Sequence, residues 1–412
     1  MPGWPSCACG NARRAATCPP RRWWAAARPS SNCGARPGHG WSGAMASEHS
    51  PLNDESRVMN PSTLWYTRCP VPTAFGVAVE RGFLDAELAR DGIVARSLAS
   101  STDNQVRQSH FHHSQPNSFR HGGNGPPLVT RSRGGRVKLI GLSWNDSIKP
   151  MLVMPDSGIA SVRELAGRKV SLPIRAGDSI DFWKASSLRG TELALAREGM
   201  TMDDVAMTPV STNRTFMDGA TASTARTATL WGAQCMLGHQ REEAFALVRG
   251  EVDALYSQGA IAAVVMGFTG AVAIADAASS PDLAGRVNND APLALTVSED
   301  LLAEQPELVA RCLAAVLRAA AWAAANEREA KRVIAADTGL PEELVDAAFP
   351  QEVHRQLEVD LRPEWVEALR VQHDHLLRHG FLAAPIDFDR FVDHGPLRRA
   401  REILAGEAAV SQ

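Results

Sequence analysis

The chain has 412 residues and a formal net charge of -3, with 44% hydrophobic and 22% charged residues. This length is enough for two lobes with cores of their own, and the charge gives no broad basic surface for nucleic acid. We therefore expect no nucleic-acid partner. Because no run of about 18 apolar residues is present, we also expect no membrane insertion.

The first fifty residues differ in composition from the rest of the chain. Residues 1–47 contain six arginines and four tryptophans but no lysine and no acid, and Pro, Arg and Gly interrupt every apolar stretch of signal-peptide length. We predict a disordered extension over 1–50. The polar sequence after Met45 is typical of a protein start, which favours an over-extended gene start. A zinc knot is the lesser alternative, because the spacing of the four cysteines in this segment does not fit common patterns; they are Cys7, Cys9, Cys18 and Cys33.

The body of the chain has three scattered cysteines, Cys69, Cys235 and Cys312. They do not form a disulfide framework, which favours a reducing compartment. With no signal peptide or lipobox visible, we expect a cytoplasmic protein. Cys235 and Cys312 fall in apolar helical patterns and are interpreted as packing residues.

Cys69 lies between a predicted strand and a predicted helix. The sequence TLWYT at 63–67 is typical of a strand, and apolar residues over 73–88 recur at helical spacing. Pro72 can open that helix, so Cys69 would lie near a helix N-terminus, where the dipole favours a thiolate. A small buried filler is the alternative interpretation of this cysteine. Residues 89–108 are polar and predict a connection.

The stretch SHFHHSQPNSFRHGGNGPPL, residues 109–128, shows neither helical nor strand periodicity and predicts a site-building loop. Arg120 supplies a permanent charge with a forked donor face for an oxyanion. Gly122, Gly123 and Gly125 let the backbone approach a ligand and present its N–H groups. Together with the thiol of Cys69 and nearby imidazoles, these groups indicate cysteine chemistry on a small anionic substrate.

A metal site is the alternative for the histidines of this stretch, which are His110, His112, His113 and His121. An HxHH loop can chelate a metal, but no carboxylate partners lie nearby in the sequence. We therefore expect no metal and no cofactor.

The remaining elements alternate between strands and helices. Strands are expected at 136–143, 151–154, 169–172, 251–257, 271–276 and 292–297, helices at 178–189 and 231–249, a weakly ordered loop at 208–229, and a helical tail from Glu299 to about Ile403. This alternation predicts an α/β fold with mostly parallel, doubly wound sheets.

Four fragments carry a family resemblance: LWYTRCPVPTAFGVAVERGFLDA, SHFHHSQPNSFRHGGNGPPL, LAGRKVSL and GEVDALYS. They resemble the aryl sulfinate desulfinases, enzymes that turn 2'-hydroxybiphenyl-2-sulfinate into 2-hydroxybiphenyl and sulfite. The resemblance covers most of the chain from about Ser62 onward. The family shares its fold with the type II periplasmic solute-binding proteins for sulfonates, nitrate and thiamine precursors.

The resemblance implies a two-lobe architecture with the ligand in the cleft between the lobes. Residues 51–145 together with 291–400 would form lobe 1, and residues 146–290 would form lobe 2. A monomer is expected, with a small sulfinate or sulfonate-like anion as its partner.

The resemblance also implies a role for each site residue. Cys69 would be the proton donor to the ring carbon or the nucleophile on sulfur, and His110 would orient or polarise the reacting groups. Arg120, with the backbone of Gly122 and Gly123, would hold the sulfinate oxygens. The candidates to contact the aryl ring are Phe111, Phe119 and Trp183. His112, His113 and His121 are imidazoles that the family does not require.

Two functions therefore remain open at this stage. The first is a desulfinase-like hydrolase that breaks a C–S bond of an aryl sulfinate. The second is a substrate-binding protein for a sulfonate-like anion, because an arginine and glycine amides serve binding equally well. The pairing of Cys69 with His110 favours the enzyme, since binding alone requires no thiol beside an imidazole.

Overall fold

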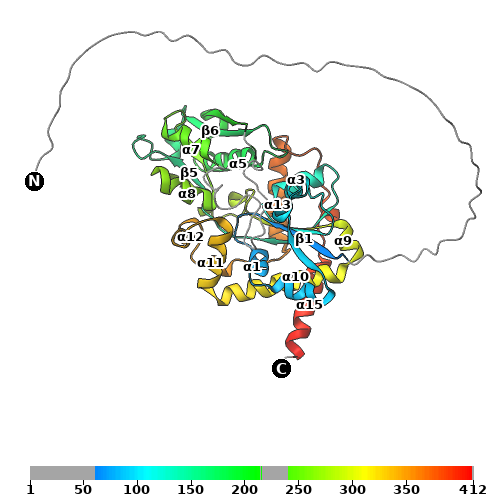
Figure 1. Cartoon of the computed structure of the whole chain (residues 1–412). Helices are drawn as coiled ribbons and strands as arrows, with labels where there is room; N and C mark the ends of the chain where they lie inside the picture. The colour runs from blue at the N-terminus through cyan, green and yellow to red at the C-terminus, as the bar shows by residue number, and fades with distance from the viewer. Residues whose placement is uncertain (1–60, 214, 216–239, 411–412) are drawn as a thin grey trace, which may run out of the picture. The chain divides into compact units, whose positions relative to one another are not determined.

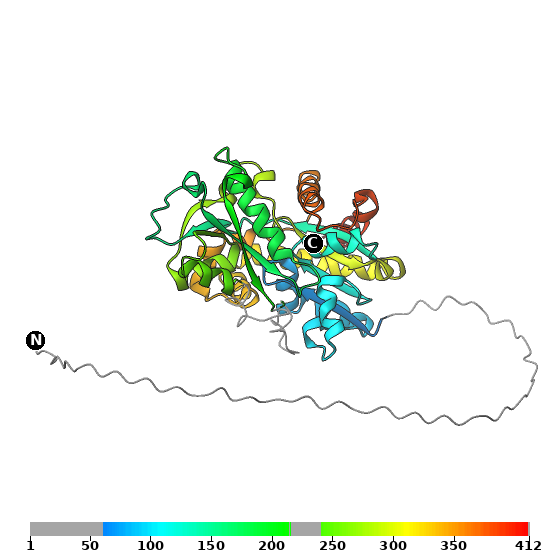
Figure 2. The same cartoon turned by 90° about the horizontal axis from the view of Figure 1, so that it is seen from above.

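The computed structural model describes residues 61–213, 215 and 240–410. All of these belong to one compact unit, Arg57–Gln412. Within the described residues, strands form two five-stranded sheets, sheet A and sheet B. In Figures 1 and 2 the green elements around sheet B lie to one side of the blue and cyan elements of sheet A.

Sheet A has the strand order β2-β1-β3-β10-β4. Its strands are β1 (Thr63–Arg68), β2 (Val94–Ser97), β3 (Ser118–Gly122), β4 (Val137–Ser143) and β10 (Leu293–Ser298). Strands β2 and β3 run parallel to β1, whereas β10 runs antiparallel to both of its neighbours.

Sheet B has the strand order β7-β6-β8-β5-β9. Its strands are β5 (Pro150–Val153), β6 (Lys169–Arg175), β7 (Ala206–Thr212), β8 (Ala254–Tyr256) and β9 (Val272–Asp276). Strands β7 and β8 run parallel to β6, whereas β5 runs antiparallel to β8 and β9.

The chain passes between the sheets twice, once from β4 to β5 and once from β9 to β10. The predicted α/β fold is confirmed, but each sheet is mixed. The chain enters sheet B at β5 and returns to sheet A at β10. Neither strand follows a helical crossover from a strand of its own sheet, and each lies antiparallel to its neighbours. The strands divide between the sheets as the predicted lobes imply; the exact lobe boundaries stay a proposal.

Helices cover both sheets. The α-helices are α1 (Ala74–Glu80), α2 (Phe83–Leu88), α3 (Asn104–His112), α4 (Gly125–Ser132), α5 (Phe182–Ala196), α7 (Arg241–Val248), α8 (Gly259–Thr269), α9 (Glu299–Glu304), α10 (Pro306–Ala325), α11 (Glu327–Thr338), α12 (Val345–Ala348), α13 (Pro363–Arg378), α14 (Phe388–Phe391) and α15 (Gly395–Val410). The short 3₁₀ helices are Ala89–Asp91, Leu98–Ser100, Val162–Leu165, Met202–Asp204, Ala277–Ser279, Ala284–Arg286, Glu342–Leu344 and Val353–Arg355.

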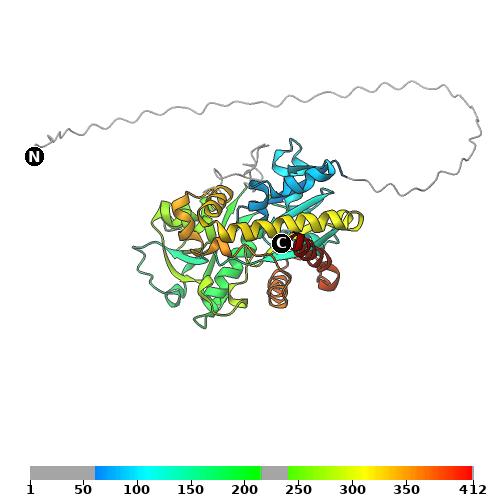
Figure 3. The same cartoon turned by 90° about the horizontal axis from the view of Figure 1, so that it is seen from below.

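The long helix α10 lies against α1, α2 and α15, as Figure 3 shows. By length and composition alone it could cross a membrane, but 56% of its apolar window is buried inside the protein. Cys312 lies on its buried face in the main core, which confirms it as a packing residue. Burial raises the pKa of this thiol to about 12.

Several predicted elements differ from the observed ones. The stretch 109–128 is not one loop: it contains the end of α3, all of β3 and the start of α4. The helix expected over 73–88 is two helices, because Gly82 has a left-handed φ of 75° between them. Residues 89–108 include β2, and the loop expected at 208–229 begins with the end of β7.

Some predictions fall on residues outside the described ranges. These are the N-terminal extension 1–50 with its four cysteines, the later part of the loop at 208–229, and Cys235. The helix expected at 231–249 is described only from residue 240, where α7 covers Arg241–Val248.

Candidate active site

A cavity lies where the chain passes between the two sheets. It is lined by Cys69, Pro70, Val71, His110, Phe111, Arg120, Gly123, Pro126, Asn145, Ser147, Phe182, Trp183, Gln258, Gly259, Ala260, Ile261, Asn289, Asp290 and Phe349. These residues come from the end of β1, from α3 and β3, from both crossing segments, from the first turns of α4, α5 and α8, and from the end of α12. The cavity thus lies at strand ends and helix starts, where ligands bind in open α/β sheets.

Cys69 follows directly after β1 and forms part of the cavity wall. Its N–H donates to the carbonyl of His121 on β3 at 3.2 Å, so the parallel pairing of β1 and β3 continues up to the cysteine. A Cβ atom on Gly122 would lie 2.2 Å from Cys69 Sγ. The sulfur can occupy its position only because residue 122 has no side chain.

His110 presents its ring to the cysteine from the last turn of α3. Its Nε2 lies 3.4 Å from Cys69 Sγ, and its Nδ1 lies 2.8 Å from the Thr67 hydroxyl. The residue is fully buried, and burial, followed by the charge of Arg120, lowers its pKa well below 6.5. His110 is therefore a neutral imidazole at neutral pH, able to accept or pass on a proton.

Arg120 projects from β3 and contacts the same sulfur from another side. Its Nη2 donates to Cys69 Sγ at 3.2 Å, while Nε donates to the His110 carbonyl at 3.0 Å and Nη1 to the Gly123 carbonyl at 2.8 Å. Only 2% of the residue is exposed, and burial lowers its pKa, which the neighbouring Cys69 opposes. The two backbone carbonyls fix the guanidinium and aim one edge at the thiol.

The charges at the cavity suit a small anion. Among the described lining residues, Arg120 is a guanidinium and Asp290 a carboxylate. Asp290 accepts a hydrogen bond from Ser147 and lies 3.4 Å from the buried Lys149 ammonium. The cations of Arg120 and Lys149 and the carboxylate of Asp290 sum to about one net positive charge beside the neutral His110. This charge matches a ligand with a single negative charge.

Aromatic rings form the apolar side of the cavity. Phe111 stacks on Phe182 with ring centroids 6.1 Å apart, and Trp183 meets Phe182 edge to face at 6.5 Å. The structure places the predicted ring contacts Phe111 and Trp183 in the cavity wall. Phe119 does not line the cavity: along β3 it points to the face opposite Arg120 and stacks on Phe75 in the core, so the structure lends no support to its prediction as a ring contact.

The predicted glycines separate into two roles. Gly123 lines the cavity, and a Cβ there would lie 2.6 Å from the Asn289 amide. Gly122 is not among the lining residues and lies behind Cys69, so its contact with a ligand stays a prediction.

The extra histidines of this region face different partners. His113 Nδ1 lies 3.2 Å from the Thr130 hydroxyl and His121 Nε2 lies 3.0 Å from the Ser143 hydroxyl, while His112 is half-buried at the end of α3. Burial and the charge of Arg120 lower the pKa of His121 to about 3 and that of His113 well below 6.5. Within the described part of the chain, these imidazoles and His110 do not form a metal-ligand group.

Several cavity residues were missed by the sequence analysis. Asn145 and Ser147 lie in the first crossing segment, and Asn289 and Asp290 lie in the second. Asn289 Oδ1 accepts from the Gly125 N–H at 2.9 Å, which ties the second crossing to the start of α4. The polar run before the strand at 292–297, which contains Asn289 and Asp290, was the sequence feature that could have indicated their place in the site.

Comparison with known proteins gives a distant but extensive match. No protein-family model matches the chain. The 2'-hydroxybiphenyl-2-sulfinate desulfinases of Rhodococcus erythropolis and Rhodococcus qingshengii are each 28% identical over 371 residues, covering 84% of this chain and 96% of theirs.

Solved structures agree with that match. The desulfurization enzyme DszB aligns with a TM-score of 0.66 at 28% identity, over 82% of this chain and 99% of that one. A cysteine-to-serine mutant of DszB in complex with biphenyl-2-sulfinic acid gives a TM-score of 0.65 at 27% identity, with the same coverage. The aliphatic sulphonate binding protein SsuA from Escherichia coli, at 15% identity and a TM-score of 0.56 over 81% of this chain and 92% of that one, shares the fold alone. The chain is thus similar over most of its length to the DszB-type desulfinases, at 28% identity, and it shares the fold of the type II periplasmic binding proteins.

Proposed function

We propose that the protein is a desulfinase-like hydrolase of an aryl sulfinate. The reaction consumes water and balances as ArSO₂⁻ + H₂O → ArH + HSO₃⁻. One observation carries the proposal: His110 Nε2 and Arg120 Nη2 lie 3.4 Å and 3.2 Å from Cys69 Sγ, at the wall of a cavity with one aromatic side. The names of the relatives, a sulfinate desulfinase and DszB, support it.

The substrate would lie with its sulfinate against Arg120 and its ring against the aromatic side. Two backbone carbonyls and the Cys69 sulfur use three N–H donors of the guanidinium, and its other N–H groups would serve the sulfinate oxygens. Phe111, Phe182 and Trp183 would cover the aryl ring.

Cys69 can act in either of two ways. As an acid it would donate the thiol proton to the ring carbon as the C–S bond breaks, and water would then add to the released SO₂ to give bisulfite and return a proton to the thiolate. As a nucleophile it would attack the sulfinate sulfur, and the ring carbon would leave with a proton. The Cys–S–SO₂⁻ adduct would then react with water to give the thiol and bisulfite. In both routes the neutral His110 is placed to move the thiol proton.

Mass spectrometry separates the two routes. If Cys69 is the nucleophile, rapid acid quenching during turnover should reveal a chain heavier by one SO₂ group on the peptide that contains Cys69. If Cys69 is the acid, no adduct forms, and in D₂O the ring carbon still gains one deuterium.

The function itself is tested with a panel of aryl and alkyl sulfinates, following sulfite release, beside a thermal-shift series with the matching sulfonates. Sulfite release from an aryl sulfinate supports the hydrolase. A thermal shift without sulfite release from any member of the panel would overturn it and leave the alternative, a binding protein for a sulfonate-like anion.

A further inference from the structure

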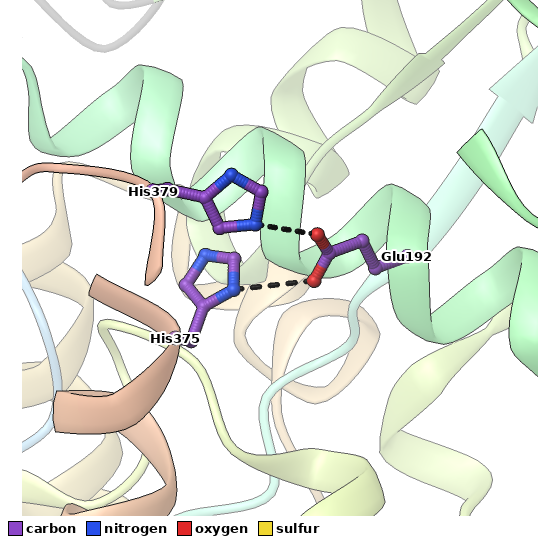
Figure 4. Close-up of side chains that lie close together, drawn as sticks. All are labelled: Glu192, His375 and His379. Carbon is purple, nitrogen blue, oxygen red and sulfur yellow. Dashed lines mark hydrogen bonds and ion pairs between the residues drawn. The ribbon is translucent and has the colours of Figure 1, made fainter. Parts of the chain in front are cut away.

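A second cluster of ligand-type side chains joins α5 to α13, and none of its members lines the cavity. Glu192 lies in the second half of α5, His375 lies in the last turn of α13, and His379 caps α13. Figure 4 shows both imidazoles facing the Glu192 carboxylate. Among the described residues this is the group of His, Cys, Asp and Glu side chains whose ligand atoms all lie within 4.8 Å of one another. His379 Nε2 is 2.6 Å from Glu192 Oε1, and His375 Nδ1 is 3.2 Å from Glu192 Oε2.

The hydrogen bonding of His375 points to a cation. The residue is fully buried, and its Nε2 lies 3.3 Å from the Ala185 carbonyl. A carbonyl only accepts, so Nε2 carries the hydrogen and, in the neutral ring, Nδ1 carries a lone pair. Nδ1 faces the Glu192 carboxylate yet has no hydrogen bond of good geometry. With the ring neutral, the Nδ1 lone pair faces the carboxylate at a buried position, an arrangement that a cation between them stabilises.

We propose that Glu192, His375 and His379 form a binding site for a divalent transition-metal ion of the zinc class. Two imidazoles with one carboxylate are a ligand set that zinc uses, with a fourth position left for water. The four-residue spacing places both histidines on one face of α13. The backbone carbonyl on the second nitrogen of His375 is the support that metal-bound histidines usually have.

The distances agree with such a site after a small adjustment. With metal–ligand bonds of about 2.1 Å, the ligand atoms of a tetrahedral ion lie about 3.4 Å apart. The separation of His375 Nδ1 from Glu192 Oε2, 3.2 Å, is already close to this value. His379 is closer and would move outward by less than about 1 Å, which its partly exposed side chain, at 26%, permits.

The neighbouring charges do not block the site. Arg189, one turn before Glu192 on α5, directs its guanidinium to the carbonyls of Val287 and Ala284 and so does not occupy the carboxylate. The site also lies at the C-terminus of α13, where the helix dipole favours positive charge.

A metal here would tie the two sheets together beside the cavity. The later part of α5 packs in the core of sheet B through Leu195, whereas α13 packs in the core of sheet A through Leu369 and Leu376. The first turn of α5 carries Phe182 and Trp183 in the cavity wall. An ion bound to Glu192 would therefore fasten this helix to sheet A.

The test uses the full chain, stripped with a chelator and then titrated with Zn²⁺ by calorimetry and with Co²⁺ by visible spectroscopy. Wild type should bind one ion per chain, the cobalt spectrum should be that of a tetrahedral nitrogen and oxygen site, and Zn²⁺ should raise the melting temperature. Glu192→Gln and His379→Gln should each weaken binding at least a hundredfold. The exposed His394→Gln is the matched control and should bind as wild type does.

The variants also separate this site from cysteine sites elsewhere in the chain. His379 is partly exposed, so His379→Gln should melt like wild type in the presence of chelator. Three results would each overturn the proposal. The wild type could fail to bind the ion, Glu192→Gln and His379→Gln could bind it as tightly as wild type does, or a sulfur-to-cobalt charge-transfer band could be the only signal.

Discussion

The site depends on ionisable residues whose charge is controlled by burial beside one fixed cation. His110 and His121 are fully buried and His113 is partly buried near Arg120, and the pKa values of all three are lowered. Such histidines stay neutral in the folded protein but take up protons in the unfolded chain below about pH 6.5. They therefore contribute to the free energy of unfolding above pH 6.5, and this contribution is lost as the pH falls.

His121 gives a measurable form of this effect. Its pKa of about 3 means that only the unfolded state binds the proton between about pH 6.5 and pH 3. Wild type should therefore lose about 2 kcal/mol relative to His121→Gln between pH 7 and pH 5. Comparison with the variant cancels Asp337 and Glu243, whose raised pKa values act in the opposite direction.

Urea unfolding at each pH gives the difference in unfolding free energy between the two proteins. With the exposed His394→Gln as control, that difference should stay constant. Parallel curves for wild type and His121→Gln would show that His121 is not held neutral by the fold.

Single residues were predictable from the sequence where chemistry alone identifies them. A thiol after a strand, a histidine and an arginine next to glycines form an unusual combination, and the structure brings Cys69, His110 and Arg120 together. Phe119 could not be placed correctly without knowing that residue 120 lies on a strand, because alternation along β3 then sends its neighbour to the other face.

At the level of elements, the position of Cys69 depends on how the end of β1 is held. Arg68 donates to the Gly76 carbonyl at 3.0 Å and pairs with Asp337 of α11 at 2.9 Å, and both side chains of the pair are almost fully buried. Burial raises the pKa of Asp337 to about 6 although Arg68 opposes it, so the pair is charged at pH 7.5.

Breaking this pair should be costly because it removes the carboxylate that faces the buried Arg68 cation. Asp337→Asn should lower the free energy of unfolding by about 3 kcal/mol at pH 7.5. The control is Asp346→Asn, which removes the exposed partner of Lys331 and should cost less than about 1 kcal/mol. Equal losses in urea unfolding would show that the Arg68 pair does not anchor β1.

The contact between β3 and Cys69 gives a second prediction at this level. In Gly122→Ala the new Cβ would lie 2.2 Å from Cys69 Sγ and must push the sulfur away from His110 and Arg120. Sulfite release should fall at least tenfold. Gly267→Ala on α8 meets nothing within 4 Å and should keep wild-type activity. If Gly122→Ala were as active as wild type, the precise position of the sulfur would not matter for turnover.

Most helices and strands could be predicted where the apolar residues follow a clear pattern. Elements without such a pattern could not be predicted. The strands β1, β4 and β10 were expected close to their observed bounds because their apolar runs are continuous. The stretch 109–128 is polar and rich in glycine, so the α3–β3–α4 sequence within it is stabilised by its burial in the protein rather than by local pattern.

For the whole molecule, the site exists because the chain crosses between two sheets twice. Asn145 and Ser147 belong to one crossing and Asn289 and Asp290 to the other, and all four line the same cavity as Cys69. Residues so distant in sequence cannot be grouped from one chain alone. The resemblance to a known family supplied the two-lobe fold, whereas composition and periodicity supplied only the α/β class.

The proposed function requires that the Cys69 thiol carry out the reaction at this cavity. The most direct test measures sulfite release and ligand affinity together for Cys69→Ser, with a buried-thiol control, Cys312→Ser, judged on sulfite release per folded molecule. We expect Cys69→Ser to bind an aryl sulfinate within a few fold of wild type but to release sulfite about a thousandfold more slowly. Full sulfite release by Cys69→Ser would show that the thiol is not the reacting group.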